Sequence, residues 1–171
     1  MKPTLLIIGA GPIGIELAIH AIDTYNVTVL EKSNSFAGNV REWGHVRLFS
    51  PWSLNTSPLG STIADLSSVP LDSYPLGSEY ISTYLSPLWS HLSASPSASL
   101  HTSTSAVSVC RLGSSKGSML GRTGKFRVLA SRKGGKEELF ECDRIADCTG
   151  TWGNRNWMGE GGMPAVGERK L

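Results

Sequence analysis

The beginning of the chain carries the pattern that most constrains the fold. Residues 4–8 form a short apolar run, which is typical of a buried parallel strand. The turn sequence Gly9-Ala10-Gly11-Pro12-Ile13-Gly14 follows, and apolar residues then recur at helical spacing over residues 13–22. A second apolar run, rich in β-branched residues, covers residues 27–30. The sequence therefore predicts a strand, a glycine turn, a helix and a second parallel strand in direct succession.

Each glycine of this turn has a mechanical explanation. Gly9 permits a sharp turn after the strand, Gly11 lets a pyrophosphate approach the backbone, and Gly14 lets the helix pack against the sheet. The helix N-terminus offers free N–H groups and a partial positive charge to phosphate groups. These features predict a dinucleotide site. The alternative, a turn that only packs the two strands and the helix together, leaves the acidic residue after the second strand unexplained.

That acidic residue is Glu31, which ends the second strand. At this place a carboxylate accepts hydrogen bonds from the ribose hydroxyls of an adenosine. A 2′-phosphate on the same ribose would meet a like charge, which disfavours NADP here. The motif alone does not separate FAD from NAD.

The rest of the chain favours FAD. Residues 32–39 are polar and loop-like, and a long aromatic segment follows them. A helix is predicted over residues 77–92, with a kink at Pro87 and one apolar face made of Tyr80, Ile81, Tyr84, Leu85, Leu88 and Leu92. Residues 93–99 indicate a loop.

Three predicted strands follow, over residues 106–112, 125–131 and 136–141, and the last two are joined by a hairpin signal, Arg-Lys-Gly-Gly. A short strand over residues 143–148 leads into Thr149-Gly150-Thr151. An NAD-dehydrogenase domain would instead continue with further strand–helix units. A stand-alone NAD-binding Rossmann domain therefore stays only as an alternative.

Several segments together resemble the N-terminal FAD-binding half of flavin-dependent oxidoreductases, a family related to flavoprotein monooxygenases and pyridine-nucleotide-disulfide-type reductases. The resemblance runs from about Leu5 to the C-terminus and is carried by GAGPIGIELA, LEKS, GNVREWGHVRLFSPWSLN, SEYISTYLSPL and DCTGTWGNRN. It implies an α/β fold: a Rossmann-like FAD-binding domain with a parallel sheet and a β-meander. The expected single domain, 1–171, comprises a βαβ unit (4–31), a flavin-proximal insertion (32–98), the meander and closing strand (99–151) and a tail (152–171).

The same resemblance implies roles for individual residues. The FAD pyrophosphate would be held by Gly9, Gly11 and Gly14, with Ala10, Pro12 and Ile13 lining the turn. Glu31 would bind the adenosine ribose, Lys32 would flank the adenine, and Val107 would pack on the adenine or bind it through its backbone. Gly38 and Asn39 would lie on the pyrophosphate and flavin side, and Arg41 would lie near a phosphate. The segment Thr149-Gly150-Thr151 would close over the cofactor.

The stretch WGHVRLFSPW, residues 43–52, is unusually rich in aromatic and polar side chains. A buried strand would explain Val46, Leu48 and Phe49 by alternation but would leave the other large side chains unexplained. We therefore interpret the stretch as a wall near the flavin, with Trp43, Arg47 and Trp52 as candidates for contact with cofactor or substrate.

The resemblance also implies that a complete enzyme takes electrons from NAD(P)H bound by a second domain. No second glycine motif is present, so we expect a chain that is incomplete at its C-terminus, with the NAD(P)H-binding domain missing or supplied separately. The alternative is a non-catalytic FAD- or ADP-binding module or a truncated product. No catalytic acid or base and no substrate is assigned.

Charge and composition exclude other classes of protein. A net charge of +2 argues against nucleic acid as a partner, and Glu16 interrupts the N-terminal apolar run, which argues against a signal peptide or membrane segment. Three cysteines without paired spacing favour the cytoplasm.

The four histidines lack metal-ligand spacing, so no metal is expected. A G-x-S-x-G match at residues 113–117 lacks the helix that a nucleophile elbow needs.

Overall fold

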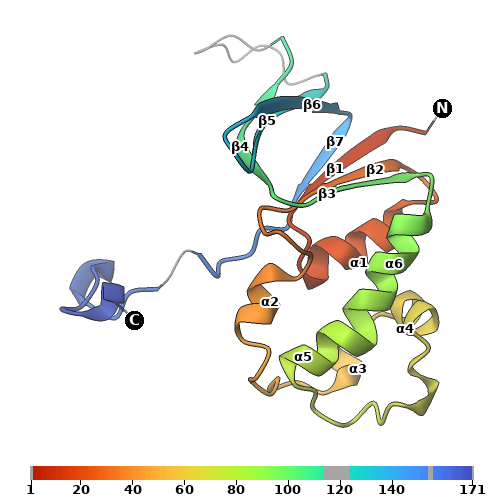
Figure 1. Cartoon of the computed structure of the whole chain (residues 1–171), viewed down its shortest axis with the longest axis vertical. Helices are drawn as coiled ribbons and strands as arrows, with labels where there is room; N and C mark the ends of the chain where they lie inside the picture. The colour runs from red at the N-terminus through yellow and green to blue at the C-terminus, as the bar shows by residue number, and fades with distance from the viewer. Residues whose placement is uncertain (1, 114–123, 154–155, 171) are drawn as a thin grey trace.

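The computed structural model describes residues 2–113, 124–153 and 156–170. The G-x-S-x-G match therefore lies outside the described residues, apart from Gly113. The centre of the molecule is a parallel sheet in the order β3-β2-β1-β7 (Figure 1). Its strands are β1 (Thr4–Ile8), β2 (Asn26–Leu30), β3 (Ala98–His101) and β7 (Arg144–Asp147). The two inner strands are apolar along most of their length, as expected of a parallel sheet covered on both faces.

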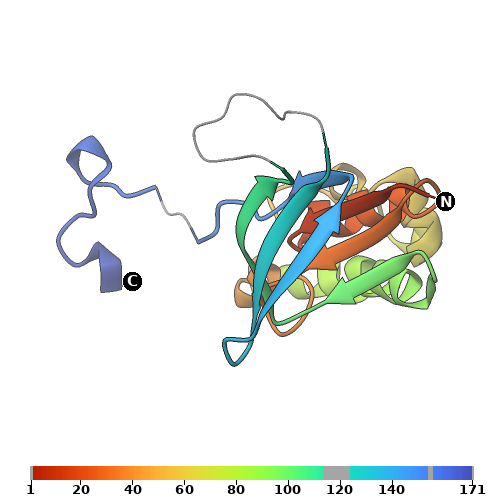
Figure 2. The same cartoon turned by 90° about the horizontal axis from the view of Figure 1, so that it is seen from above.

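An antiparallel sheet covers one face of the parallel sheet (Figures 1 and 2). It contains β4 (Thr104–Arg111), β5 (Phe126–Arg132) and β6 (Glu137–Cys142), in that order. Val128 and Ala130 of β5 pack with Leu6 and Leu30 of the parallel sheet in a small core of their own. This meander confirms the predicted order of elements. Gly134 (φ +94°) and Gly135 (φ +82°) form its predicted hairpin turn.

Helices cover the opposite face (Figure 1). Helix α1 (Pro12–Ala21) packs beside one long helical stretch built from α5 (Gly77–Tyr80), a π-helical turn η2 (Ile81–Leu85) and α6 (Ser86–Ala94). All six residues of the predicted apolar face on this stretch are buried: Tyr80, Ile81, Tyr84, Leu85, Leu88 and Leu92. The long connection between β2 and α5 adds α2 (Gly38–Glu42), α3 (Trp52–Asn55), α4 (Pro58–Ala64) and the 3₁₀ turn η1 (Leu66–Ser68).

The predicted kink at Pro87 takes the form of the π-helical turn. Proline has no N–H to donate, and its ring clashes with the carbonyl one turn earlier. The chain widens to π geometry over Ile81–Leu85 and resumes the α-helix at Ser86, which places Pro87 in the first turn of α6. The wider turn accommodates a residue that cannot donate the usual hydrogen bond to the preceding helical turn.

Two details differ from the sequence prediction. The predicted loop at residues 93–99 contains the start of β3, a parallel strand beside β2. The helical spacing over residues 13–22 includes Ile13 in the apolar face of α1, but Ile13 is 70% exposed in the structure, whereas Ile15 and Ile19 are buried. The helix turns the side of Gly14 and Ala18 toward the sheet, because small residues allow the closest approach.

The C-terminal segment extends away from the two sheets (Figures 1 and 2). It contains the short turns η3 (Glu160–Gly162) and η4 (Glu168–Lys170). The Glu168 carboxylate accepts hydrogen bonds from the backbone N–H groups of Met158 and Ala165. In the described part of the chain, no helix is long and apolar enough to cross a membrane.

Candidate functional site

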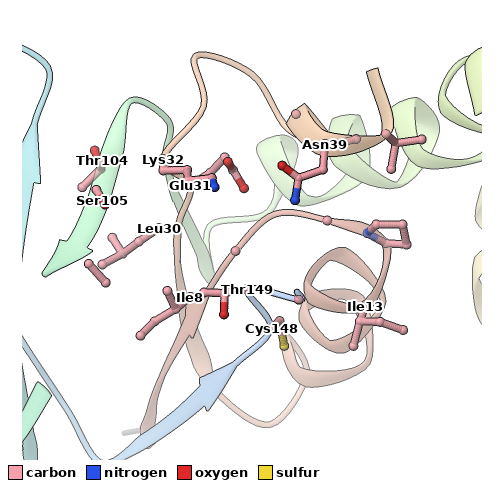
Figure 3. Close-up of a pocket in the computed structure, with 18 residues that line it drawn as sticks. Ile8, Ile13, Leu30, Glu31, Lys32, Asn39, Thr104, Ser105, Cys148 and Thr149 are labelled. Carbon is pink, nitrogen blue, oxygen red and sulfur yellow. The ribbon is translucent and has the colours of Figure 1, made fainter. Parts of the chain in front are cut away.

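A cavity of about 370 Å³ lies at the carboxyl ends of β1, β2 and β7 (Figure 3). In open α/β sheets this edge is where ligands bind. One wall is the turn from β1 into α1 together with the start of α2. The other wall is the end of β2 and the first residues of β4, and the chain after β7 closes the bottom.

Two glycines of the turn are required by the protein's own packing. Gly9 has φ +102°, and its N–H donates to the carbonyl of Leu30 at 2.7 Å, which ties the turn to β2. A Cβ on Gly14 would lie 2.0 Å from the carbonyl oxygen of Gly9. A side chain at Gly14 would push α1 away from the sheet, and a side chain at Gly9 would meet the backbone carbonyl oxygen of Cys148 at 2.7 Å.

Gly11 differs from the other two glycines. Its φ of −77° is open to any residue, and a Cβ placed there would have no protein atom within 4 Å. The fold itself therefore does not require glycine at this position. The free space belongs to the cavity, so a ligand that comes close to the backbone is the remaining explanation for a glycine here.

The N-terminus of α1 faces the same cavity. No side chain caps it, and its first residue, Pro12, has no N–H. The N–H groups of the first turn have no acceptor within a helix. Together with the helix dipole they favour an anionic group such as a phosphate at this point. The residues present thus fit a pyrophosphate beside Gly11.

Glu31 lines the cavity beyond the glycine turn, and its side chain is buried. Its Oε2 accepts the backbone N–H of Ala10 at 2.7 Å, and its Oε1 accepts the N–H of Ser33 at 2.8 Å. Each carboxylate oxygen has two acceptor positions, so one on each oxygen stays available for a ribose hydroxyl. Figure 3 shows Glu31, Lys32 and Asn39 along one side of the cavity.

The β4 end of the cavity combines polar and apolar surface. Thr104, Ser105 and Ala106 form this end, beside Ile8 and Leu30. Thr104 is held in place by its N–H, which donates to the carbonyl of Glu31, and by its hydroxyl, which donates to the carbonyl of Thr102. A flat ring such as adenine would find apolar contact here and backbone groups at its edge.

The chain after β7 carries a cysteine into the cavity. Burial, followed by the charge of Asp147, raises the pKa of the Cys148 thiol. The hydroxyl and N–H of Thr149 donate to Asp147 and lower the pKa of that carboxyl. Cys148 is therefore protonated at neutral pH and is not an activated nucleophile.

Most residues predicted for the site come together in this cavity: Gly9, Gly11, Pro12, Ile13, Glu31, Lys32, Gly38, Asn39, Thr149 and Gly150 all line it. Gly14 lies directly beneath the turn. The structure does not bring Arg41, Trp43, Arg47, Val107 or Thr151 to the cavity wall.

The residues outside the wall have other contacts. The Arg41 guanidinium lies over the ring of Phe36, 4.9 Å from its centroid, and the Trp43 ring packs against Gly77. Arg47 donates a hydrogen bond to the carbonyl of Tyr74.

The candidates Trp52 and Val107 are also placed away from the cavity. Trp52 is buried against Tyr80, with ring centroids 5.9 Å apart. Val107 sits at a β-bulge in β4, and its side chain is 58% exposed.

Sequence reasoning missed the β4 end of the cavity, formed by Thr104, Ser105 and Ala106, and the cavity position of Cys148. The signal that was available is positional, because Thr104 comes three residues after the end of the edge strand β3, which was not predicted. In the described part of the chain, no group of three or more His, Cys, Asp or Glu side chains is arranged to hold a metal ion.

The arrangement of the two sheets defines the class: this is an α/β protein with a Rossmann-type fold, which it shares with FAD-dependent oxidoreductases among the solved structures. Among solved structures it resembles bacillithiol disulfide reductase from Bacillus cereus, with a TM-score of 0.65 and 18% identity over 93% of this chain and 43% of that chain. It also resembles ornithine hydroxylase from Pseudomonas aeruginosa in its reduced form, with a TM-score of 0.64 and 20% identity over 88% of this chain and 39% of that chain.

A third similar structure is S-allyl-L-cysteine S-oxygenase from Allium sativum, with a TM-score of 0.62 and 16% identity over 88% of this chain and 37% of that chain. The chain thus spans less than half the length of each of these three proteins. A scan against protein-family models gives no match. A search of curated proteins gives none either. At these identities the similarity establishes the fold.

Proposed function

We propose that this chain is the FAD-binding segment of an NAD(P)H-dependent flavoprotein oxidoreductase of the reductase or monooxygenase type. The observation that carries the proposal is the pairing of two features in one cavity. At one place the uncapped N-terminus of α1 meets open space at Gly11, and further along the carboxylate of Glu31 keeps two acceptor positions available. A pyrophosphate and an adenosine ribose require these two features in this order.

The proposed arrangement follows the cavity from end to end. The pyrophosphate lies beside Gly11 and Ile13, the ribose hydroxyls donate to Glu31, and the adenine lies against Leu30 and β4. The flavin end leaves the cavity past Asn39 of α2. When bound, FAD supplies the transfer of hydride and electrons, and these residues hold and orient it.

The antiparallel sheet supports FAD rather than NAD. A nicotinamide-binding Rossmann domain continues beyond its third strand with further helix–strand units. Here β3 leads instead into the three-stranded meander, which packs on the parallel sheet and supplies one end of the cavity. The similar solved structures, a disulfide reductase and two oxygen-inserting enzymes by name, support the same choice.

In the proposed enzyme the electron donor is NAD(P)H, bound outside this segment by a further domain or a separate chain. The chain spans less than half of its structural neighbours, which supports a division of this kind. We place the protein in the cytoplasm, because Cys110, Cys142 and Cys148 are all free thiols.

Titration of the purified protein with FAD, FMN, ADP and NAD⁺ tests the cofactor. We expect FAD to bind, ADP to compete with it, and FMN, which lacks the adenosine part, to bind at least about tenfold more weakly. Binding is followed by quenching of flavin fluorescence and by calorimetry. Tight binding of NAD⁺ without binding of FAD would contradict the proposal and favour the NAD-binding alternative.

Anaerobic addition of NADH or NADPH to the FAD-loaded protein then tests the donor. Bleaching of the flavin absorbance would show that the segment exchanges electrons with the donor. Because the proposal places the donor site outside this segment, we expect FAD to bind without being reduced.

A further inference from the structure

A second cavity adjoins the proposed cofactor cavity at its β4 end. It has a volume of about 430 Å³, and Lys32 and Ser105 line both cavities. The residues that line it are all of polar or charged types. Its wall is formed by the cationic side chains of Lys32, Arg132 and Lys133, by the hydroxyls of Ser103, Ser105 and Ser131, and by one amide, Asn34.

The wall is held together by backbone hydrogen bonds between three distant segments. The N–H of Ser103 donates to the carbonyl of Ser33 at 2.8 Å, and the N–H of Lys133 donates to the carbonyl of Ser103 at 3.0 Å. Ser103 has φ +51°, a left-handed conformation that a serine keeps only when its surroundings hold it there. The cationic groups therefore project from a fixed frame.

Positive charge dominates this cavity. Arg132 shares its charge with Glu138, at 2.6 Å, and also donates from Nη2 to Nδ1 of His101. The His101 pKa is lowered, first by burial and then by the Arg132 charge, so its ring is neutral and accepts this bond. The guanidinium keeps further donors available after these two contacts.

The two lysines contribute their full charge. Among the described residues, Lys32 and Lys133 belong to none of the ion pairs. The nearest carboxylate on the cofactor side, Glu31, directs its oxygens to the N–H groups of Ala10 and Ser33.

We infer that this cavity is a second binding site, for a phosphate group of a phosphate monoester. Ammonium and guanidinium groups with several hydroxyl donors match a compact, doubly charged oxyanion. The cavity has too few cationic side chains to bind nucleic acid, and the whole chain carries a net charge of only +2. Five of its seven lining residues belong to it alone, so it can be tested whether or not FAD is the ligand of the first cavity.

The phosphate could belong to a separate small phosphate ester or to the ribose of the nucleotide in the first cavity. Both offer the same chemistry to Lys32 and Lys133. A ribose phosphate would stand beside the carboxylate of Glu31, which favours the separate ester.

Calorimetric titration with inorganic phosphate at constant ionic strength tests the site. The variants are Lys133→Ala and, as a matched control, Lys136→Ala, which removes the same charge from the same hairpin outside the cavity wall. We expect saturable binding that Lys133→Ala weakens about tenfold and Lys136→Ala leaves unchanged. FAD affinity, measured separately, should be the same in both variants. Absence of saturable phosphate binding, or an equal loss in both variants, would overturn the inference.

Two further titrations identify the source of the phosphate. If phosphate binds with unchanged affinity in the presence of saturating ADP, the ligand is a separate ester. If instead adenosine 2′,5′-bisphosphate or 3′,5′-bisphosphate binds more tightly than ADP, and Lys133→Ala removes the gain, the phosphate belongs to the nucleotide. A protein that binds phosphate in this way but fails to bind FAD would contradict the proposed cofactor and leave the second site intact.

Discussion

The carboxylate of Glu31, at the end of β2, accepts a hydrogen bond from the backbone N–H of Ala10, in the glycine turn, at 2.7 Å. Its other oxygen accepts the N–H of Ser33. One side chain therefore fixes two segments of the cavity wall in addition to its proposed role toward ribose. We predict that Glu31→Gln lowers the free energy of unfolding by about 1–3 kcal/mol, because the new amide places a donor against a backbone N–H. Urea denaturation of the ligand-free protein at neutral pH measures this change.

The control for this prediction is Glu137→Gln, which removes the same charge from an exposed position on β6. We expect it to change the free energy of unfolding by less than about 0.5 kcal/mol. In the FAD titration, Glu31→Gln should also weaken binding, since one ribose acceptor is lost. Wild-type stability together with wild-type FAD affinity in Glu31→Gln would show that neither role is real.

Substitutions at Gly11 and Gly14 distinguish the effect of a glycine on ligand affinity from its effect on folding stability. We predict that Gly14→Ala lowers the free energy of unfolding by at least about 2 kcal/mol, because its methyl group would meet the backbone carbonyl of Gly9. Gly11→Ala should leave the stability of the ligand-free protein within about 0.5 kcal/mol of wild type, because its methyl group enters open space. It should nevertheless weaken FAD binding at least about tenfold, by occupying the place of the pyrophosphate.

Thermal unfolding and FAD titration of the same two variants provide the test. The prediction fails if Gly11→Ala binds FAD like wild type, since the open space at Gly11 would then not be used by the ligand. Gly14→Ala with unchanged stability would show that α1 can shift away from β1 at little cost.

The first part of the fold could be predicted because its signals are local. Strand β1 spans the predicted residues 4–8, and α1 and β2 begin within one residue of their predicted starts. The apolar face of residues 77–92 was equally clear, since helical periodicity persists through the π-helical turn. In each case the residues that decide the structure are neighbours along the chain.

Strand β3 could not be predicted for the opposite reason. Its residues, Ala98–His101, include no β-branched side chain, and they become a strand by pairing with the free edge of β2. The stretch from Trp43 to Trp52 does not line the cavity, and its interpretation as a wall near the flavin stays a prediction. Within it, Trp52 packs against Tyr80 of the long helical stretch, whereas Phe49 is 96% exposed.

The two sides of the cavity also differ in how well the sequence predicts them. The side formed by the glycine turn and Glu31 follows from one motif. The β4 side depends on where the meander docks, and a bulge between Ala106 and Ser108 decides which residues face the cavity. The sequence therefore indicated Val107, whereas the structure places Ser105 and Ala106 on the cavity wall.

Trp43 provides a test of whether the aromatic stretch serves packing or cofactor binding. A Cβ on Gly77 would lie 2.9 Å from two atoms of the Trp43 ring and 3.0 Å from the Cα of Gly44. We predict that Gly77→Ala lowers the free energy of unfolding by about 1–3 kcal/mol. FAD affinity of the folded variant should stay at the wild-type value, because neither residue lines the cavity.

Gly153→Ala is the matched control for Gly77→Ala. The nearest atom to its added methyl group is the Lys32 Nζ at 3.8 Å, an ordinary contact, so we expect little change in unfolding. A loss of FAD affinity in Gly77→Ala at full stability would instead support the earlier interpretation of Trp43 as a wall near the flavin.

A buried tyrosine pair makes the stability of the fold sensitive to alkaline pH. The Tyr84 hydroxyl donates to Glu16 on α1 and accepts the N–H of Ser57, and its ring stacks on Tyr80 at 5.5 Å. Burial, followed by the hydrogen bond to Glu16, raises the pKa of Tyr84 from 10.0 to about 12. Burial also raises the pKa of Tyr80, and the charges of Tyr84 and Glu16 add to this effect.

The sign of the effect follows from proton binding. Below about pH 10 both the folded and the unfolded chain hold the Tyr84 proton, so its contribution to stability is complete. Above about pH 10 the unfolded chain releases the proton while the folded chain keeps it up to about pH 12. The free energy of unfolding should therefore fall over this range, by up to about 2–3 kcal/mol from Tyr84, since one pKa unit corresponds to about 1.4 kcal/mol.

Urea denaturation at a series of pH values between about 8 and 11 measures this decline. Tyr84→Phe should be less stable than wild type at neutral pH, because Glu16 loses its donor, and its stability should fall less steeply above about pH 10. The control, Tyr74→Phe, removes a hydroxyl from an exposed ring and should follow the wild-type curve. Parallel curves for wild type and Tyr84→Phe would show that the Tyr84 hydroxyl ionises alike in the folded and unfolded chain, and that the contact between α1 and the π-helical turn does not depend on its proton.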